Sequence, residues 1–239
     1  MGERVAPLAP PMPPYTAAVF DMDGLLLDSE RPVRAAWLHV AASLGVNLTA
    51  PVYLDLIGLN HRESAARLQA IFGDATLLAE AYAQVQARLA EQFGDKPFDV
   101  KPGARRLLQS LQDAGIPCAV ASSTAHDEVR RRLERAGLSS FFAAICGGND
   151  VKHGKPHPDI YLLAVQRLGA TAGHTLAFED SGHGALAALA AGVGVVLVPD
   201  LEPAEPAWQS RSTAVLATLN EACQRSTEWF GFQCAPAAD

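Results

Sequence analysis

Short apolar runs alternate with helical patterns along most of the chain. Five of these runs have the length of buried strands. They are residues 17–20, 116–121, 142–146, 175–178 and 195–198. Apolar residues at helical spacing occur beside these runs, and a glycine follows each helical pattern. The helices predicted in this way cover residues 104–114, 126–136, 158–168 and 185–191. This alternation predicts an α/β fold whose core is a doubly wound, Rossmann-like parallel sheet covered by helices.

The region that follows the first run has helical patterns only. Apolar positions at helical spacing predict helices at residues 31–44, 63–72 and 78–89. The first strand precedes this region and its partner strands follow it, so the simplest architecture inserts a helical domain after the first strand. We expect a flexible Pro-rich tail, a sheet core in two segments and an inserted helical domain. Their bounds are 1–14 for the tail, 15–30 and 97–239 for the core, and 31–96 for the helical domain.

Composition excludes several classes of protein. The 239 residues are 49% hydrophobic, which is enough for a substantial core. The formal net charge of -7 argues against an electrostatic nucleic-acid binder, and no apolar run is long enough to cross a bilayer. The N-terminus lacks the apolar segment of a signal peptide, and the four cysteines show no C-x-x-C spacing. We therefore expect a cytoplasmic protein with reduced, buried thiols.

The first run ends in Asp21 and Asp23, at the carboxyl end of the predicted strand. Ligands bind at this end in open α/β sheets, and residues two apart in an extended chain point to the same side. Two buried carboxylates repel each other unless a cation or a shared proton lies between them. A D-x-D pair alone is more often a turn. A calcium loop is excluded, because Leu25 and Pro32 stand where that loop needs oxygen ligands.

The other predicted strands also end in polar residues. Ser122 and Ser123 follow the second strand, where hydroxyls suit phosphate oxygens, although helix capping is their commoner role. Lys155 lies in a proline-rich segment just before a helix, a position from which it can reach a phosphate. Glu179 and Asp180 follow the fourth strand. Oxygen ligands from Asp21, Asp23 and Asp180 would suit Mg²⁺.

Several further positions are harder to interpret from the residues alone. His157 and His183 lack neighbours at zinc-ligand spacing, so we expect no metal role for them. His61 and Arg62 fall in the inserted domain, where a loop facing the core could recognise the substrate, and a plain surface role is equally open. We expect residues 201–208 to form a surface loop. We expect the tail beyond Asn220 either to pack on the core or to contact a partner, and the sequence pattern does not distinguish the two alternatives.

Taken in order, four motifs resemble those of the haloacid dehalogenase-like superfamily. They are Val-Phe-Asp-Met-Asp-Gly at 19–24, Ala-Ser-Ser at 121–123, Gly-Lys-Pro-His-Pro-Asp at 154–159 and Phe-Glu-Asp-Ser at 178–181. The first motif and the residues after it are most similar to the branch of sugar-phosphate phosphatases and β-phosphoglucomutase-type proteins. The resemblance implies a Rossmann-like core, and the inserted helical domain then corresponds to the small α-helical cap of that branch.

The resemblance also implies roles for the residues that match its motifs. Asp21 would be the nucleophile that forms an aspartyl-phosphate, and Asp23 the general acid and base. Mg²⁺ would be held by Asp21, Asp180 and the Asp23 carbonyl, with Glu179 as a further ligand or beside one. Ser122 and Lys155 would bind phosphoryl oxygens, and Ser123, His61 and Arg62 would contact the substrate. The expected reaction is hydrolysis of a small phosphorylated metabolite, such as a sugar phosphate.

Two alternatives remain open. The mutase relatives carry a His where this chain has Val33, and their phosphate-gripping Arg is matched only by Arg62 with a shift of one residue, so a phosphatase is preferred to a hexose-phosphate mutase. Residues 31–95 contain no Lys, which disfavours the phosphonate-cleaving branch. A non-catalytic regulator that binds a phosphorylated ligand is the other alternative. We expect a monomer or homodimer that binds neither nucleic acid nor membrane.

Overall fold

The computed structural model describes residues 14–57, 59, 61–201 and 205–236. Its centre is a six-stranded parallel sheet with the order β3-β2-β1-β4-β5-β6. The strands are β1 Ala17–Phe20, β2 Cys118–Ala121, β3 Ala144–Cys146, β4 Thr175–Glu179, β5 Gly194–Leu197 and β6 Ala214–Val215. The chain builds outward from β1 to β3 and then returns to the other side of β1, so the order reverses between β1 and β4. The predicted doubly wound α/β fold is confirmed.

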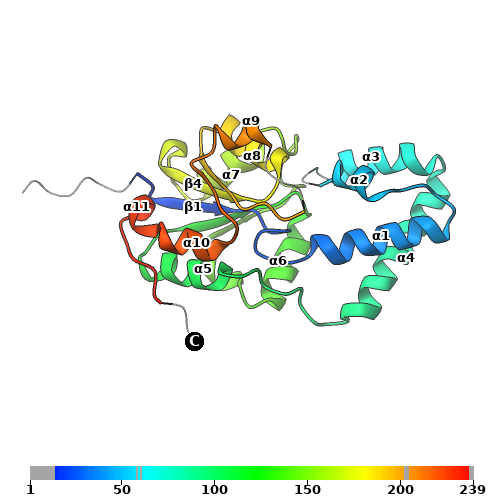
Figure 1. Cartoon of the computed structure of the whole chain (residues 1–239), viewed down its shortest axis with the longest axis horizontal. Helices are drawn as coiled ribbons and strands as arrows, with labels where there is room; N and C mark the ends of the chain where they lie inside the picture. Colours follow the sequence, from blue (N-terminus) through cyan, green and yellow to red (C-terminus); the bar gives the residue numbers. More distant parts are fainter. Residues whose placement is uncertain (1–13, 58, 60, 202–204, 237–239) are drawn as a thin grey trace, which may run out of the picture.

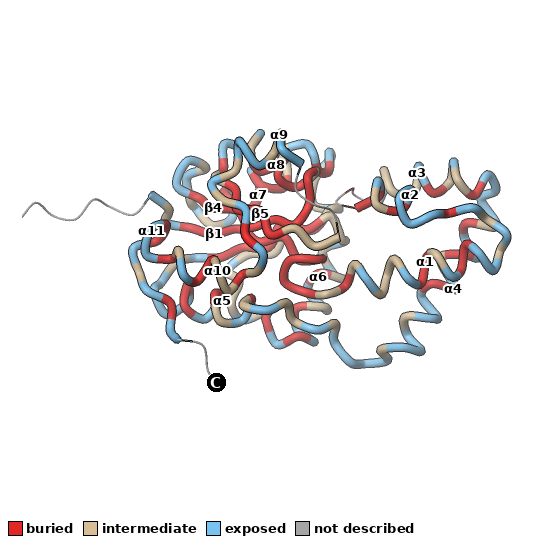
Figure 2. Tube along the Cα trace, in the orientation of Figure 1, coloured by how far each residue is buried: buried red, intermediate tan, exposed pale blue. Residues whose placement is uncertain are grey.

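Helices cover both faces of the sheet because alternate residues of the buried strands point to opposite sides. Ala18 and Phe20 of β1 join one hydrophobic cluster, whereas Val19 joins the other. The first cluster includes residues of α5 (Ala104–Asp113), α6 (His126–Arg135), α10 (Leu219–Gln224) and α11 (Ser226–Phe230). The second includes residues of α7 (Asp159–Arg167) and α8 (Gly182–Ala190). Both layers are visible in Figure 1, and Figure 2 shows that the strands between them are buried.

Four consecutive helices form a separate part of the structure beside the carboxyl ends of the strands (Figure 1). They are α1 Glu30–Ser43, α2 Ala50–Leu54, α3 His61–Phe72 and α4 Ala75–Phe93. Their apolar faces make a hydrophobic cluster of their own, in which the Trp37 and Tyr82 rings lie 4.9 Å apart, edge to face. We call α1–α4 the helical segment. Two chain connections lead into it, and they pair with each other through Leu27 and Val100.

Among the predicted strands, the second, the third and the last differ from the structure, each for a local reason. The second strand starts at Cys118 because the Ile116 amide donates to the Leu111 carbonyl and so closes α5. The third starts at Ala144 because Phe142 ends a 3-10 turn. The run ending at Val198 was expected to be the last strand, which is wrong. A further strand, β6, is only two residues long and pairs with β5 through backbone hydrogen bonds, which side-chain pattern does not reveal.

The C-terminal part of the chain packs on the core. Trp229 and Phe230 are buried in the first cluster, and the Trp229 ring lies 6.1 Å from that of Phe178 on β4. Residues 201–208 were expected to form a surface loop. This expectation is wrong for residues 206–208, which are helical. Helix α9 (Pro206–Gln209) places Trp208 so close to Gly182 that a side chain at that glycine would collide with the indole ring. Residues 202–204 and the Pro-rich residues 1–13 lie outside the described residues.

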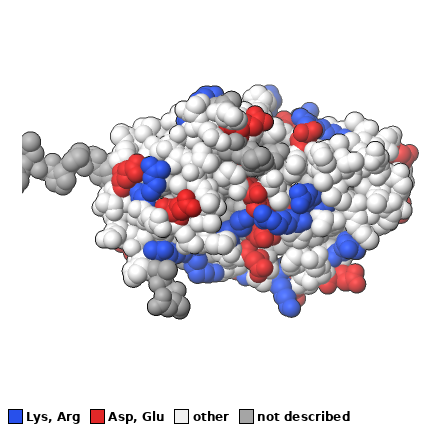
Figure 3. All heavy atoms as spheres, in the orientation of Figure 1, with Lys and Arg blue, Asp and Glu red and all other residues white. Residues whose placement is uncertain are grey.

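The described residues include no helix that is long and apolar enough to cross a membrane. On the face shown in Figure 3, Lys and Arg side chains alternate with Asp and Glu side chains over a largely uncharged surface. This face therefore carries no extended patch of a single charge sign. The four cysteines are buried and unpaired, as the sequence predicted.

Candidate active site

The carboxyl ends of β1 and β4 lie side by side and bring three acidic residues together. Phe20 pairs with Phe178 across the two strands, and the Asp21 amide donates to the Phe178 carbonyl at 3.0 Å. Carboxylate oxygens of Asp21, Glu179 and Asp180 all lie within 4.8 Å of one another, and the three residues are buried. This is the point where the strand order reverses, which is where ligands bind in open α/β sheets.

Lys155 supplies the positive charge within this group. Its Nζ lies 2.6 Å from Asp21 Oδ1 and 2.6 Å from Glu179 Oε1, and its side chain is only 1% exposed. Burial opposes the charged form, yet the charges of Asp21 and Glu179 raise the pKa of Lys155 above its usual value. Burial also raises the pKa of Asp21 to about 8, even though Lys155 acts in the opposite direction. One ammonium thus contacts two of the three carboxylates, and the three acidic residues lie close enough together to hold a further cation.

Both oxygens of Glu179 are occupied by hydrogen bonds from the protein itself. Oε1 accepts from Lys155 and from the Tyr161 hydroxyl. Oε2 accepts from the backbone amides of Asp180 and Ser181 and from the Ser181 hydroxyl. A carboxylate with this many donors has little capacity left for a metal ion. Glu179 was expected to be either a metal ligand or a residue beside one. The geometry favours the second role, in which Glu179 holds Lys155 in place beside a metal site.

Asp180 differs from Glu179, because no described residue donates a hydrogen bond to its carboxylate. The side chain is nevertheless buried, and burial, followed by the charge of Asp21, raises its pKa well above the usual range. Gly24 gives the carboxylate its space. With φ of +83°, a Cβ there would lie 2.1 Å from Asp180 Oδ2. An oxygen ligand without a partner is the feature that a divalent cation requires.

Replacing Gly24 by Ala is expected to lower both stability and activity. A residue with a side chain at positive φ loses roughly 1–2 kcal/mol of folding free energy, and the added methyl group would also displace Asp180. We expect a lower melting temperature and at least a tenfold loss of kcat/KM. Gly115→Ala is the matched control, because Gly115 also has positive φ but has open space around it. The Gly115→Ala variant should lose stability but keep its activity. Equal losses of activity in both variants would contradict the role given to Asp180.

Asp23 lies outside the acidic group, and four donors surround its carboxylate. Ser29 donates to Oδ1 at 2.7 Å, Thr124 to Oδ2 at 2.8 Å and Ser122 to Oδ2 at 3.4 Å. Arg132 Nη1 donates to Oδ1 at 2.6 Å. Burial alone would raise the pKa of Asp23, but the charge of Arg132 and the hydrogen bonds lower it below the usual value. The Asp23 side chain therefore does not join the metal group, and only its carbonyl remains as the expected ligand.

Sequence patterns did not identify Arg132 as a site residue. It belongs to a run of charged residues on α6 that has the appearance of a solvated helix face. In the structure its side chain is 21% exposed, pairs with Glu128 as well as Asp23, and lies over the ring of Phe98 at 5.3 Å. Phe98 belongs to the connection between α4 and α5. Arg132 thus links the Asp23 carboxylate to the connection that leads out of the helical segment.

Ser122 and Ser123 lie where β2 ends, beside Asp23. Ser122 is buried and its hydroxyl accepts a hydrogen bond from the Thr124 amide, while Ser123 lines the cavity described below. The glycine pair after β3 keeps this loop in position. A Cβ on Gly147 would lie 2.2 Å from the His126 amide nitrogen, and one on Gly148 would lie 2.2 Å from the Ser123 carbonyl oxygen. Only glycine allows the two loops to approach this closely.

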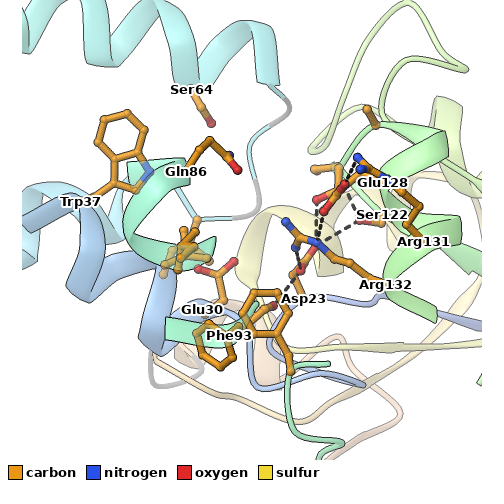
Figure 4. A pocket seen from close by; sticks show the side chains of 18 of the residues that line it. Asp23, Glu30, Trp37, Ser64, Gln86, Phe93, Ser122, Glu128, Arg131 and Arg132 are labelled. Atoms are coloured by element: carbon orange, nitrogen blue, oxygen red, sulfur yellow. Dashed lines mark hydrogen bonds and ion pairs between the residues drawn. The ribbon is translucent and has the colours of Figure 1, made fainter. Parts of the chain in front are cut away.

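A cavity of about 970 Å³ separates the sheet from the helical segment. Asp21, Asp23 and Asp180 lie on its floor, and Ser122 and Arg132 on its core side. The helical segment supplies aromatic, aliphatic and uncharged polar residues on the opposite side. Those that Figure 4 labels are Trp37, Ser64, Gln86 and Phe93, and Glu30 lies between them and Asp23. A cavity of this volume can hold a small molecule, one end of which would reach the carboxylates.

Of the two predicted residues of the helical segment, Arg62 can be compared with the cavity. Arg62 is exposed and is not among the residues that line it. The side chain of His61 lies outside the described residues, so its expected role stays a prediction. Of the two histidines expected to have no metal role, His157 is exposed, and His183 Nδ1 lies 3.1 Å from the Ile57 carbonyl oxygen of the helical segment.

A doubly wound sheet with an acidic group and a buried lysine at the strand ends is suited to phosphoryl transfer. The model of the haloacid dehalogenase-like hydrolase family matches residues 18–198. The chain belongs to this family. It is 36% identical to a probable pseudouridine-5'-phosphatase of Drosophila melanogaster over 210 residues, which cover 85% of this chain and 90% of the relative. The resemblance stated from the motifs is thereby confirmed.

Two further comparisons agree with this assignment. A phosphorylated carbohydrates phosphatase of Thermotoga maritima is 33% identical and covers 74% of this chain and 82% of its own length. Among solved structures, CbbY from Rhodobacter sphaeroides in complex with phosphate superimposes with a TM-score of 0.71 at 26% identity, covering 87% of this chain and 96% of that one. The protein is therefore a phosphoric monoester hydrolase of this family.

Proposed function

We propose that the protein is a Mg²⁺-dependent phosphatase that hydrolyses a small phosphorylated metabolite, most simply a sugar phosphate, through an aspartyl-phosphate on Asp21. The observation that carries this proposal is the position of Asp21. Its carboxylate is buried beside Lys155 and Asp180 at the point where the strand order reverses, and it faces the cavity. Asp23 lines the same cavity two residues further along the chain.

In the first step Asp21 attacks phosphorus. Lys155 bonds to Oδ1, which leaves Oδ2 available for the attack. A bond forms between this oxygen and phosphorus, the bond to the leaving oxygen breaks, and that oxygen takes a proton from Asp23. Lys155 and Ser122 are positioned to donate hydrogen bonds to the other phosphoryl oxygens. Asp23 needs a proton for this step, so its ion pair with Arg132 has to open before the leaving group departs.

In the second step Asp23 acts as a base. It takes a proton from a water molecule, which attacks phosphorus and releases Asp21 and inorganic phosphate. The anionic form of Asp23 is the one that Arg132, Ser29 and Thr124 stabilise. The contacts described above therefore suit Asp23 at the start of the second step, and the proton that it takes there is the one that the leaving oxygen receives in the next turnover.

The donor set fits Mg²⁺. Asp180 offers a carboxylate to which no described residue donates a hydrogen bond, Asp21 offers one oxygen, and the Asp23 carbonyl is the third expected ligand. Glu179 is better suited to holding Lys155 for the reason given above. When bound, the ion would supply charge neutralisation between the Asp21 carboxylate and the phosphate dianion.

We assign residues 31–96 as a cap that closes over the substrate. The two connections into it lie side by side: the Asp28 amide donates to the Asp99 carbonyl, and the Lys101 amide donates to the Leu26 carbonyl. Paired connections of this kind suit a hinge, and closure would exclude water from the phosphate. The buried, unpaired thiols support a cytoplasmic location.

The cavity favours a phosphatase over a mutase. Val33 lines it at the position where the mutase relatives carry a His, and Arg62 does not reach it. The names of the two relatives support a substrate with a sugar portion, since one is a probable pseudouridine-5'-phosphatase and the other a phosphorylated carbohydrates phosphatase.

The proposal is tested by assaying the purified protein on phenyl phosphate and on a panel of sugar and polyol phosphates. Free phosphate should appear in the presence of Mg²⁺. Removing the metal with EDTA should reduce the rate at least about 100-fold, because the ion contributes several kcal/mol of charge stabilisation. Excess Mg²⁺ should restore it, which controls for damage by the chelator. Full activity in EDTA, or no turnover of any ester, would show that the proposal is wrong.

A further inference from the structure

Two of the four cysteines form a close pair, and neither lines the cavity above Asp21. Cys223 lies near the end of α10, and Cys234 follows α11 in the C-terminal segment. The Ser226 hydroxyl joins their backbones, because it donates to the Cys223 carbonyl at 2.9 Å and accepts from the Cys234 amide at 3.2 Å. The two thiols hydrogen-bond to each other. This contact meets the first requirement of a disulfide, since cysteines whose side chains point apart cannot be bridged.

The C-terminal segment around Cys234 is held against the core by hydrogen bonds to its backbone. After α11 the segment turns back towards α5 (Figure 1). The Thr227 hydroxyl donates to the Phe232 carbonyl at 3.1 Å, and Arg106 Nε of α5 donates to the Ala235 carbonyl at 2.7 Å. These contacts fix the chain on both sides of Cys234, so its thiol stays in the pair.

The surroundings of Cys234 favour its thiolate. Hydrogen bonds from the Cys223 thiol and the Ser110 hydroxyl, together with the charge of Arg106, lower the pKa of Cys234 below its usual range, although burial acts in the opposite direction. The hydrogen bond between the thiols raises the pKa of Cys223. The thiolate is the reactive form of cysteine, so Cys234 is the more nucleophilic member of the pair.

A second cavity, of about 750 Å³, opens beside the two cysteines, and both line it. Its other lining residues include Arg106, Gln224 and Gln233. Cys223 is only 3% exposed and Cys234 only 8%, which disfavours contact with a bulky disulfide reagent. A molecule close to the size of water can reach the sulfur atoms from the cavity. Hydrogen peroxide is an oxidant of that size.

We propose that Cys234 and Cys223 form a peroxide-reactive site, in which oxidation joins the C-terminal segment to α10 by a disulfide bond. In the first step the Cys234 thiolate attacks one oxygen of hydrogen peroxide. The S–O bond forms, the O–O bond breaks, and the departing hydroxide takes up the proton that Cys234 released, which gives water and a sulfenic acid. This inference does not depend on the proposed phosphatase activity.

In the second step the Cys223 sulfur attacks the Cys234 sulfenic acid. The S–S bond forms and the S–O bond breaks, and the departing hydroxide takes the proton of the Cys223 thiol to become a second water molecule. The two thiols together lose two electrons, and hydrogen peroxide gains them. A thiol reductant reverses the change by attacking the disulfide.

Peptide mapping of the whole protein tests the proposal. Arg225 lies between the two cysteines, so trypsin separates them unless a disulfide joins their peptides. The protein is treated with a small excess of hydrogen peroxide, quenched with catalase, blocked with iodoacetamide and digested without reductant. We expect the peptide that ends at Arg225 to be linked to the one that begins at Ser226, and dithiothreitol should separate them.

Cys118 and Cys146 are internal controls, because they lie on β2 and β3 and burial raises their pKa to about 12 and about 11. Cys234 should lose its thiol at least about 10-fold faster than either of them. Cys223→Ser should stop at the sulfenic acid, which dimedone traps on Cys234, and Cys234→Ser should give no linked peptide. Cys146→Ala keeps the pair and should give as much linked peptide as the wild type.

Three results would each overturn the inference. They are equal oxidation of all four cysteines, a linked peptide that contains Cys118 or Cys146, and a disulfide between two copies of the chain on a non-reducing gel. Should a serine variant fail to fold, alkylation of the reduced wild type by iodoacetamide still decides the matter. Cys234 should be the first of the four to react, and a Cys234 that reacts no faster than Cys118 would contradict its thiolate character.

Discussion

Asp21→Asn should reduce kcat at least about 10⁴-fold, the scale seen when a nucleophile is removed from an enzyme. A carboxamide cannot attack phosphorus, but its oxygen can still accept the hydrogen bond from Lys155. The variant should also keep its fold, because it removes one of three crowded buried carboxylates. The measurement is steady-state release of phosphate together with acid-quenched trapping of the phosphoenzyme, which should form in the wild type and be absent from the variant.

Asp28→Asn controls for the effect of introducing an amide a few residues after the same motif. Asp28 is half-buried, pairs with Arg31 on the surface and does not line the cavity. This variant should keep most of its activity. An Asp21→Asn protein that retains more than about a tenth of the wild-type rate, after deamidation is excluded by mass, would remove Asp21 from the role of nucleophile and with it the aspartyl-phosphate pathway.

Lys155→Met should damage both stability and activity. The ammonium is the one cation that contacts the buried acids Asp21 and Glu179 in the part of the chain that the structure describes. Breaking a buried ion pair on one side costs about 3–5 kcal/mol, because the partner charge is left uncompensated. We also expect kcat to fall at least about 100-fold, the scale of losing one oxyanion donor, since Asp21 would lose its positioning contact.

Lys152→Met is the matched control for Lys155. It lies three residues earlier in the same loop and is exposed. Thermal unfolding and kcat of this control should stay close to the wild type. Added Mg²⁺ should recover part of the stability of Lys155→Met, because a divalent cation can compensate the same carboxylates. A Lys155→Met protein as stable and as active as the control would show that the ammonium is dispensable.

Much of the fold followed from pattern because its elements are buried in a regular way. Buried parallel strands are short apolar runs, and a glycine follows each of the four helices predicted between them. The order of these elements alone predicted the doubly wound sheet. The prediction failed where an element is held by backbone contacts. Strand β6 has no distinctive side chains and pairs with β5 through amide and carbonyl groups. Helix α9 follows from the packing of Trp208 over Gly182, a contact that no local pattern contains.

Some residues of the candidate site could likewise be predicted from the sequence, and others could not. The convergence of five site residues could be inferred, because each follows a strand or precedes a helix and parallel strands present their carboxyl ends at one edge of the sheet. These residues are Asp21, Asp23, Ser122, Lys155 and Asp180. Arg132 could not be inferred, because it is separated from Asp23 by 109 positions and lies in a charged helical run. Glu30 comes shortly after the first motif, and the sequence pattern did not indicate that it lines the cavity.

The sequence by itself determined the class of fold, the family and the acidic, hydroxyl and ammonium groups available for phosphate chemistry, because these depend on local periodicity and on motifs at strand ends. Only the tertiary structure decided how the groups are shared. It engages Glu179 with Lys155 and Tyr161 and holds Asp23 against Arg132, while no described residue donates a hydrogen bond to the Asp180 carboxylate. The physical reason is that contacts between distant segments decide which donors each carboxylate accepts from. The order of the strands and the packing of α6 on the core set those contacts.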